Sequence, residues 1–360
     1  MRPRVIHLAG EPHAMGRQYG EALRAEIQAL AEERLRLARR DAEQRGRRPT
    51  RAQCLDAAAR CLPAHAAYDP EGFAEFQGIA EGAGIAPELL LIGNGYTDYK
   101  DLLGLGRTDE ECTAFWVRPE AAGGRTLCGQ TWDMHATAEP FAVLVHRRPA
   151  RGPETLSLTV AGCLSLIGLN SAGVAVGNTN LTATDARPGV IYVALIHRAL
   201  RSRSLPAAVA AFTEAPRAAG HNYYLADASG QVSDVETTAG RAVVLSPEGD
   251  GYVHTNHYTA PELLPLAVPP DPESTTRERH ARMSALLSEA PRPLTPEGIR
   301  QLLADHAGGE RAICVHNTTP DGGKSCAVVV MCPQTRELWV RVGTPCGGPL
   351  HRVALDDVAA

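Results

Sequence analysis

The first hundred residues carry apolar side chains at the three- and four-residue spacing of amphipathic helices. The longest such stretch, residues 15–40, is rich in Ala, Leu, Glu and Arg, and it is interrupted only at the Gly and Pro of residues 46–49. Shorter stretches with the same character cover residues 51–62 and 70–81, and another begins at residue 87. The pattern therefore predicts a helical N-terminal segment.

From Cys112 onward the pattern changes to short apolar and β-branched runs that Gly-rich turns separate. These runs reach residue 181, and further ones follow helical stretches at 191–213, 277–287 and 295–304. The strands gather in groups with helices between the groups, instead of alternating with helices one for one. This order predicts an α+β fold with mainly antiparallel sheets, and not a doubly wound parallel sheet.

The composition is that of an ordinary globular protein. The 360 residues are 44% hydrophobic and 21% charged, with a net charge of −5. A chain without a basic excess is not expected to bind nucleic acid. The N-terminus lacks the apolar core of a signal peptide, and no apolar run has the length of a membrane span. We therefore expect a cytoplasmic protein that has no membrane partner.

The nine cysteines are scattered along the chain, and no two form a Cys-x-x-Cys pair. Neither a zinc ribbon nor a thioredoxin-like redox pair is indicated, so the sequence predicts no metal site. His254 and His257 have a His-x-x-His spacing, but residues three apart on a strand face opposite sides, which indicates structural roles. Most of the cysteines are expected to be small hydrophobic residues of the core.

Cys112 has a more specific context. The turn-like residues 121–124 separate two strand-like arms, which predicts a β-hairpin. Reflection through the middle of that turn places Asp133 opposite Cys112. Facing side chains of an antiparallel pair have Cβ atoms roughly 5 Å apart. The sequence thus predicts a cysteine with a carboxylate beside it.

A cysteine attacks only as the thiolate, and a free thiol has a pKa near ~8.5, so it needs a base. No histidine stands in a sequence relation to Cys112 that marks it as this base, although a distant one can fold close. Cleavage between Glu111 and Cys112 would release an α-amine with a pKa of about 7.7–8 beside the thiol. Such an amine can accept the thiol proton, as in N-terminal-nucleophile enzymes.

The motifs around Cys112 resemble one known family. "CTAF" followed by "GQTWD" is similar to the start of the mature large chain in the isopenicillin N acyltransferase family, the acyl-coenzyme A:6-aminopenicillanic acid acyltransferases. "GEPHAMGRQYG", "GLNSAGVAVGNTNL", "HTNHY", "STTRERHAR" and "GTPCGGPL" follow the order of the family along nearly the whole chain. The resemblance implies the four-layer αββα sandwich of N-terminal-nucleophile hydrolases related to choloylglycine hydrolase and penicillin V acylase. It also implies a small chain, residues 1–111, and a catalytic large chain, residues 112–360.

The resemblance assigns roles to individual residues. Cys112 corresponds to the nucleophile that also drives self-cleavage after Glu111, and Asp133 to the carboxylate that holds its amine and thiol. Asn256 corresponds to the side-chain donor of the oxyanion hole, Asn180 to a second polar residue near that hole, and Arg277 to an arginine that supports the nucleophile. Neighbouring side chains of the same types could fill the last two roles: Asn178, Arg279 and Arg282. Glu111 departs from the family, whose best-known member has Gly at that position.

The implied reaction is hydrolysis or acyl transfer at a linear amide through an acyl-thioester on Cys112, in secondary metabolism, without a cofactor. The resemblance also permits acyl-coenzyme A as co-substrate. The expected partners are a small amide or acyl-thioester and the cleaved N-terminal fragment; the sequence leaves the oligomeric state open. Two alternatives remain: a non-catalytic binding protein of the same fold that stays uncleaved, and a Cys-His hydrolase that needs no cleavage.

Overall fold

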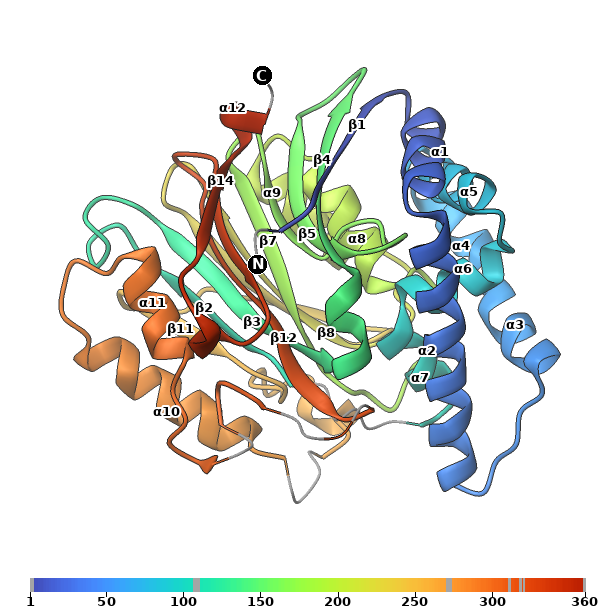
Figure 1. Ribbon diagram of the computed structural model, residues 1–360. Coiled ribbons are helices and arrows are strands. Elements are labelled where there is room, and N and C mark those ends of the chain that lie inside the picture. Colours follow the sequence, from blue (N-terminus) through green and yellow to red (C-terminus); the bar gives the residue numbers. More distant parts are fainter. Residues whose placement is uncertain are drawn as a thin grey trace.

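Two mainly antiparallel sheets lie face to face at the centre of the computed structural model, which describes residues 3–105, 111–269, 274–309, 312–316, 319 and 321–358 (Figure 1). The larger sheet has the order β1 (Val5–Gly10), β4 (Ala142–Pro149), β5 (Thr155–Val160), β6 (Ile167–Asn170), β7 (Val174–Asn180), β8 (His221–Asp227), β9 (Val232–Thr237), β10 (Ala242–Leu245). The smaller sheet has the order β11 (Gly251–His254), β2 (Thr113–Val117), β3 (Leu127–His135), β12 (Gly323–Cys332), β13 (Glu337–Val342), β14 (His351–Ala354).

Helices cover the outer face of each sheet. The helices α8 (Tyr192–Leu200) and α9 (Leu205–Thr213) contact strands of the larger sheet, while α10 (Thr276–Glu289) and α11 (Pro296–Leu303) contact strands of the smaller one. The result is four layers in the order helix, sheet, sheet, helix (Figure 1). The predicted α+β class, and the αββα order that the family resemblance implied, are confirmed.

Most of the N-terminal segment is helical, as predicted. It forms a group of helices at one end of the sheets: α1 (Pro12–Ala22), α2 (Arg24–Gln44), α3 (Arg51–Ala59), α4 (Leu62–Tyr68), α5 (Pro70–Ala83), α6 (Pro87–Asn94) and α7 (Tyr96–Leu102). Helices α1 and α5 pack backbone to backbone, since a Cβ added to Gly16 would lie 2.0 Å from the carbonyl oxygen of Glu75. The single helix expected over residues 15–40 is divided at Leu23, where φ is −126°.

The N-terminal segment also contributes a strand that the pattern did not predict. Strand β1 pairs in parallel with β4, whereas the other named strands pair antiparallel. Helix α1 then contributes a buried tyrosine, Tyr19, whose hydroxyl donates to the carbonyl oxygen of Val160, 3.0 Å away. Residues of the N-terminal helices and of both sheets belong to one hydrophobic core.

The remaining short elements are η1 (Ala136–Phe141), η2 (Leu264–Leu266), η4 (Pro345–Gly347) and α12 (Leu355–Val358). Among the described residues, no helix combines the length and the apolar character that crossing a bilayer requires.

Candidate active site

The predicted hairpin is formed by β2 and β3, but its register differs from the prediction by one residue. Thr113 lies opposite Thr131, and Asp133 pairs with Ser325 on the next strand, β12. The connection between the strands, residues 118–126, has an odd number of residues, so the hairpin is centred on Ala122 and not between two residues. Cys112 therefore precedes the paired part of β2, and Asp133 is not its cross-strand partner.

Asp133 nevertheless lies in the same hydrogen-bond network as the start of β2. The amide of Thr113 donates to Oγ1 of Thr131 over 3.1 Å, and that hydroxyl donates to Oδ2 of Asp133 over 3.4 Å. Asp133 is 1% exposed, and this burial raises the pKa of its carboxyl group to about 7, although the Ser325 hydroxyl and the Arg279 charge act in the opposite direction. A carboxyl group with this pKa can exchange a proton at neutral pH.

Cys112 is 7% exposed and is held by Asn256. Its backbone N–H donates to Oδ1 of Asn256 over 2.8 Å, and Nδ2 of Asn256 donates to the carbonyl oxygen of Asn180 over 3.1 Å. The backbone N–H of Asn256 in turn donates to Oγ1 of Thr276 over 2.8 Å. The structure therefore brings three predicted site residues together: Cys112, Asn180 and Asn256.

The arginine that reaches this site is Arg279. Its Nη1 donates to the carbonyl oxygen of Cys112 over 2.6 Å and to Oγ1 of Thr113 over 3.0 Å, while its Nη2 donates to Oδ1 of Asn256 over 3.0 Å. Arg279 is 2% exposed, whereas Arg277 lies on the exposed face of α10. The structure thus places Arg279, and not the predicted Arg277, beside the cysteine.

Glu111, the residue before the candidate cleavage point, is fixed by its side chain. Its carboxylate forms an ion pair with Nη2 of Arg279 over 3.0 Å and accepts hydrogen bonds from the hydroxyls of Ser274 and Thr275. Arg279 therefore contacts the residues on both sides of the Glu111–Cys112 bond.

A small cavity of about 110 Å³ opens beside this cluster. Thr275, Arg279 and Arg282 of α10 and its N-terminal flank form one wall, and Gly308 and Ile313 form part of the other. The cavity offers space for a small group close to the side chains that surround Cys112.

The two histidines of "HTNHY" have different partners, as their predicted structural roles require. Nε2 of His254 lies 2.9 Å from Oε1 of Glu236, and Nδ1 of His257 lies 3.0 Å from Oγ1 of Thr276. Burial acts to lower the pKa of His254, but the combined effects of Glu236, the Asp234 charge and the Thr255 carbonyl outweigh it and raise the pKa. Burial lowers the pKa of His257 to about 4. Both side chains are therefore explained by local interactions.

Several side chains that build the site are not indicated by the sequence pattern: Thr131, Ser274, Thr275, Thr276 and Ser325. Arg279 is only an alternative to Arg277 in that pattern. A usable signal was present, because the buried positions of α10 are Thr276, Arg279, Met283 and Leu287. Arg279 stands four residues before the apolar Met283, which stands four residues before Leu287, so Arg279 shares their buried face of the helix. Arg277 does not fit this spacing.

The sequence is similar to known proteins of one family. Residues 121–346 match the family model described as acyl-coenzyme A:6-aminopenicillanic acid acyl-transferase. The chain is also 28% identical over 287 residues to the acyl-coenzyme A:6-aminopenicillanic-acid-acyltransferase 40 kDa form of Emericella nidulans, covering 77% of this chain and 76% of that protein.

Two solved structures resemble the chain more distantly. One is a mutant of the conjugated bile acid hydrolase from Clostridium perfringens, with a TM-score of 0.46, 10% identity, and coverage of 68% of this chain and 93% of that one. The other is penicillin V acylase from Agrobacterium tumefaciens, with a TM-score of 0.44, 15% identity, and coverage of 68% and 86%. The family model spans more than half of the sequence and includes Asp133, Asn180, Asn256 and Arg279. The chain therefore belongs to the acyl-coenzyme A:6-aminopenicillanic acid acyltransferase family.

Proposed function

We propose that this protein is an amidohydrolase or acyltransferase that cleaves itself between Glu111 and Cys112 and then uses Cys112 as an N-terminal nucleophile. The observation that carries the proposal is the hydrogen bond from the Cys112 amide to Oδ1 of Asn256. In addition, Arg279 binds the carbonyl oxygen of Cys112 and the carboxylate of Glu111, on the two sides of the Glu111–Cys112 peptide bond. A buried cysteine that served only to fill space would not need such an arrangement.

In the first step, Sγ of Cys112 attacks the carbonyl carbon of Glu111. The C–N bond to Cys112 breaks, the thiol proton goes to the departing nitrogen, and a thioester forms between Glu111 and Cys112. Water then hydrolyses the thioester, which leaves a Glu111 carboxylate, a free thiol and a free α-amine. The ion pair with Arg279 and the hydroxyls of Ser274 and Thr275 hold Glu111 for this attack.

In the second stage the α-amine of Cys112 accepts the thiol proton, and the thiolate attacks the substrate carbonyl. Oδ1 of Asn256 keeps its contact with this nitrogen, and the guanidinium of Arg279 favours the thiolate form. The side-chain amide of Asn256 carries two N–H groups. One donates to the carbonyl oxygen of Asn180, and the other can donate to the oxyanion of the tetrahedral intermediate.

The acyl-enzyme is resolved by water in a hydrolase and by an amine in an acyltransferase. The name of the Emericella nidulans relative supports an acyl-coenzyme A or a small amide as the acyl donor. All nine cysteines lie in the described part of the chain and none of them forms a disulfide there, which supports action in a reducing compartment such as the cytoplasm. The fragment of residues 1–111 is the expected permanent partner of the large chain.

Intact mass under denaturing conditions tests the proposal. We expect two fragments that part between Glu111 and Cys112, and a single full-length chain for Cys112→Ala. A panel of small acyl-amides and acyl-thioesters then separates hydrolase from transferase, with the trapped acyl group located on Cys112 by peptide mapping.

One observation favours a second candidate, a non-catalytic binding protein. The Glu111 carboxylate binds Arg279, Ser274 and Thr275. These contacts would also stabilise a chain that stays uncleaved at Glu111–Cys112. A single full-length mass without thiol-dependent amidase activity would support this candidate. A full-length chain that is active, and loses activity when one histidine is replaced, would instead identify a Cys-His hydrolase.

A further inference from the structure

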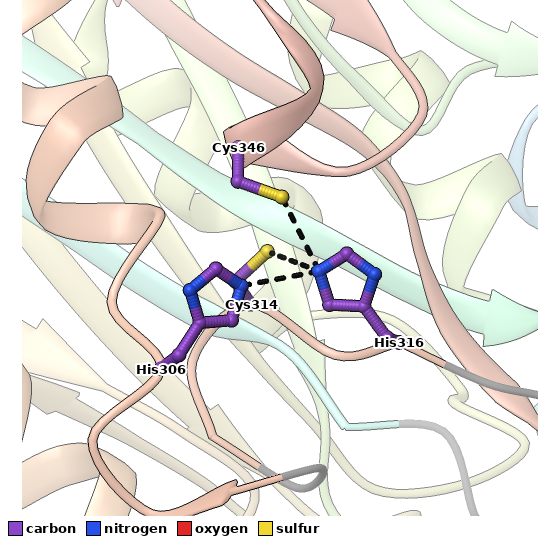
Figure 2. Close-up of side chains that lie close together, drawn as sticks. All are labelled: His306, Cys314, His316 and Cys346. Atoms are coloured by element: carbon purple, nitrogen blue, oxygen red, sulfur yellow. Dashed lines mark hydrogen bonds between the residues drawn. The ribbon is translucent and has the colours of Figure 1, made fainter.

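Four potential metal ligands meet at the surface beside the smaller sheet. His306 follows α11, Cys314 and His316 lie on the segment before β12, and Cys346 belongs to η4 between β13 and β14. Figure 2 shows their side chains pointing toward one another from these separate segments. Cys314 is buried, and the other three are exposed. Cys112 and the residues around it are not part of this cluster.

The distances in the cluster are close to those around a tetrahedral metal ion, so small shifts of the side chains would complete the site. Nε2 of His316 lies 3.1 Å from Nε2 of His306, 3.5 Å from Sγ of Cys314 and 3.2 Å from Sγ of Cys346. All four ligand atoms lie within 4.8 Å of one another. Zinc bonds of about 2.0–2.1 Å to nitrogen and about 2.3 Å to sulfur place neighbouring tetrahedral ligands roughly 3.3–3.8 Å apart.

Hydrogen bonding alone does not explain these contacts. A ring nitrogen of histidine offers either one N–H or one lone pair. Nε2 of His316 therefore cannot form three hydrogen bonds at once with His306, Cys314 and Cys346. A cation at the centre removes the conflict, because each ligand then directs one lone pair at the ion.

We propose that His306, Cys314, His316 and Cys346 bind one Zn²⁺ through Nε2 of both histidines and Sγ of both cysteines. Two thiolates with two imidazoles are a ligand set that suits Zn²⁺. Four protein ligands fill the tetrahedron, so the ion has a structural role and no open position for substrate. The sequence predicts no metal site because it has no Cys-x-x-Cys pair. Such spacing cannot reveal a site whose ligands come from three separate segments, as they do here.

The ion would stabilise the position of Cys314 and His316, which precede β12. The backbone N–H of Val315 donates to Oγ of Ser325 over 3.0 Å, and the N–H of Ser325 donates to the carbonyl oxygen of Val315 over 3.1 Å. Ser325 in turn pairs with Asp133 of the candidate active site. Zinc bound at Cys314 and His316 thus stabilises the strand position that supports Asp133.

The metal content of the full-length protein, purified without a histidine tag and dialysed, tests the proposal. We expect about one zinc per chain, and less than about a tenth of that in the double variant His316→Ala/Cys346→Ser, because this variant keeps only two of the four ligands. His351→Gln is the control, since it removes a histidine outside the cluster. The Cys112→Ala chain should hold the same amount of zinc, so the outcome is independent of the proposed self-cleavage.

A second measurement applies even where the double variant fails to fold. Cys346 is exposed, so iodoacetamide should label it in the wild-type protein after chelation and not while zinc is bound. Substitution with Co²⁺ should give the strong visible absorption of tetrahedral cobalt with thiolate ligands. The proposal is overturned if added zinc fails to bind, if the double variant keeps its full zinc content, or if Cys314 and Cys346 form a disulfide under reducing conditions.

Discussion

Replacing Arg279 by lysine keeps the positive charge beside the Glu111–Cys112 bond but removes the geometry of the guanidinium, so it separates the two contributions to cleavage. The guanidinium donates from Nη1 to the Cys112 carbonyl oxygen and from Nη2 to Oδ1 of Asn256, and Nη2 also pairs with Glu111. A lysine ammonium is a single point charge on a flexible stem, so it cannot occupy both nitrogen positions. At least one charge-assisted hydrogen bond is lost.

The size of the effect follows from that lost bond. A hydrogen bond to a charged group contributes about 1.5–3 kcal/mol, and every 1.36 kcal/mol changes a rate about tenfold. We therefore expect Arg279→Lys to slow cleavage at Glu111–Cys112 by roughly ten- to hundredfold. The time course of cleavage of freshly synthesised precursor, followed by denaturing mass spectrometry, measures this rate directly.

The same helix provides a matched control. Arg277 is exposed two residues earlier on α10, so Arg277→Lys should leave the cleavage rate unchanged within error. Each lysine variant is also made in the uncleaved Cys112→Ala background, and thermal unfolding of these two proteins checks that α10 remains intact. Equal cleavage rates for Arg279→Lys and the wild type, or equal slowing in the two lysine variants, would refute the role that the geometry assigns to Arg279.

Three other predictions concern the site and the core. Asn256→Ala should lower the amidase rate constant by about a hundred- to a thousandfold, measured on cleaved protein, because removing one oxyanion donor typically costs about 2.7–4 kcal/mol. Asp133 has a folded pKa of about 7, above its unfolded value of about 3.9, so the folded state keeps a proton that the unfolded state has released. As the pH rises from the unfolded to the folded pKa value, the free energy of unfolding should therefore decrease, by at most about 1.4 kcal/mol per pH unit. Urea unfolding in the Cys112→Ala background should show this slope, and the added substitution Asp133→Asn should remove it. Glu75→Ala should destabilise the protein by about 3–5 kcal/mol in urea unfolding, since it leaves a buried arginine without its carboxylate, whereas Glu81→Ala at an exposed ion pair should cost about 1 kcal/mol or less.

Local patterns along the chain were sufficient for much of the fold. The hairpin of β2 and β3, and the helices α8 to α11, follow from apolar periodicity and turn residues within short windows. The local pattern does not predict strand β1, because its six residues precede a helical region and its partner β4 lies more than a hundred residues away. A pairing of that kind depends on tertiary packing, which no local window contains.

Within the site, residue types were easier to predict than exact positions. The motif "STTRERHAR" predicts an arginine near the nucleophile, but the choice between Arg277 and Arg279 depends on which face of α10 meets the sheet. The one-residue error in the hairpin arose from the length of the turn. The cluster of His306, Cys314, His316 and Cys346 shows the same limit more strongly, because the fold assembles it from positions up to 40 residues apart.

The parallel pairing of β1 with β4 has a consequence for the refolding of the protein after the proposed self-cleavage. The two polypeptides would share a sheet and a core, so the proposed break at Glu111–Cys112 would remove one covalent bond and leave the tertiary contacts in place. Once fully denatured, however, the halves would have to meet again by diffusion. Renaturation of the uncleaved chain should be independent of protein concentration, while that of the cleaved form should become second-order and fail in dilute solution.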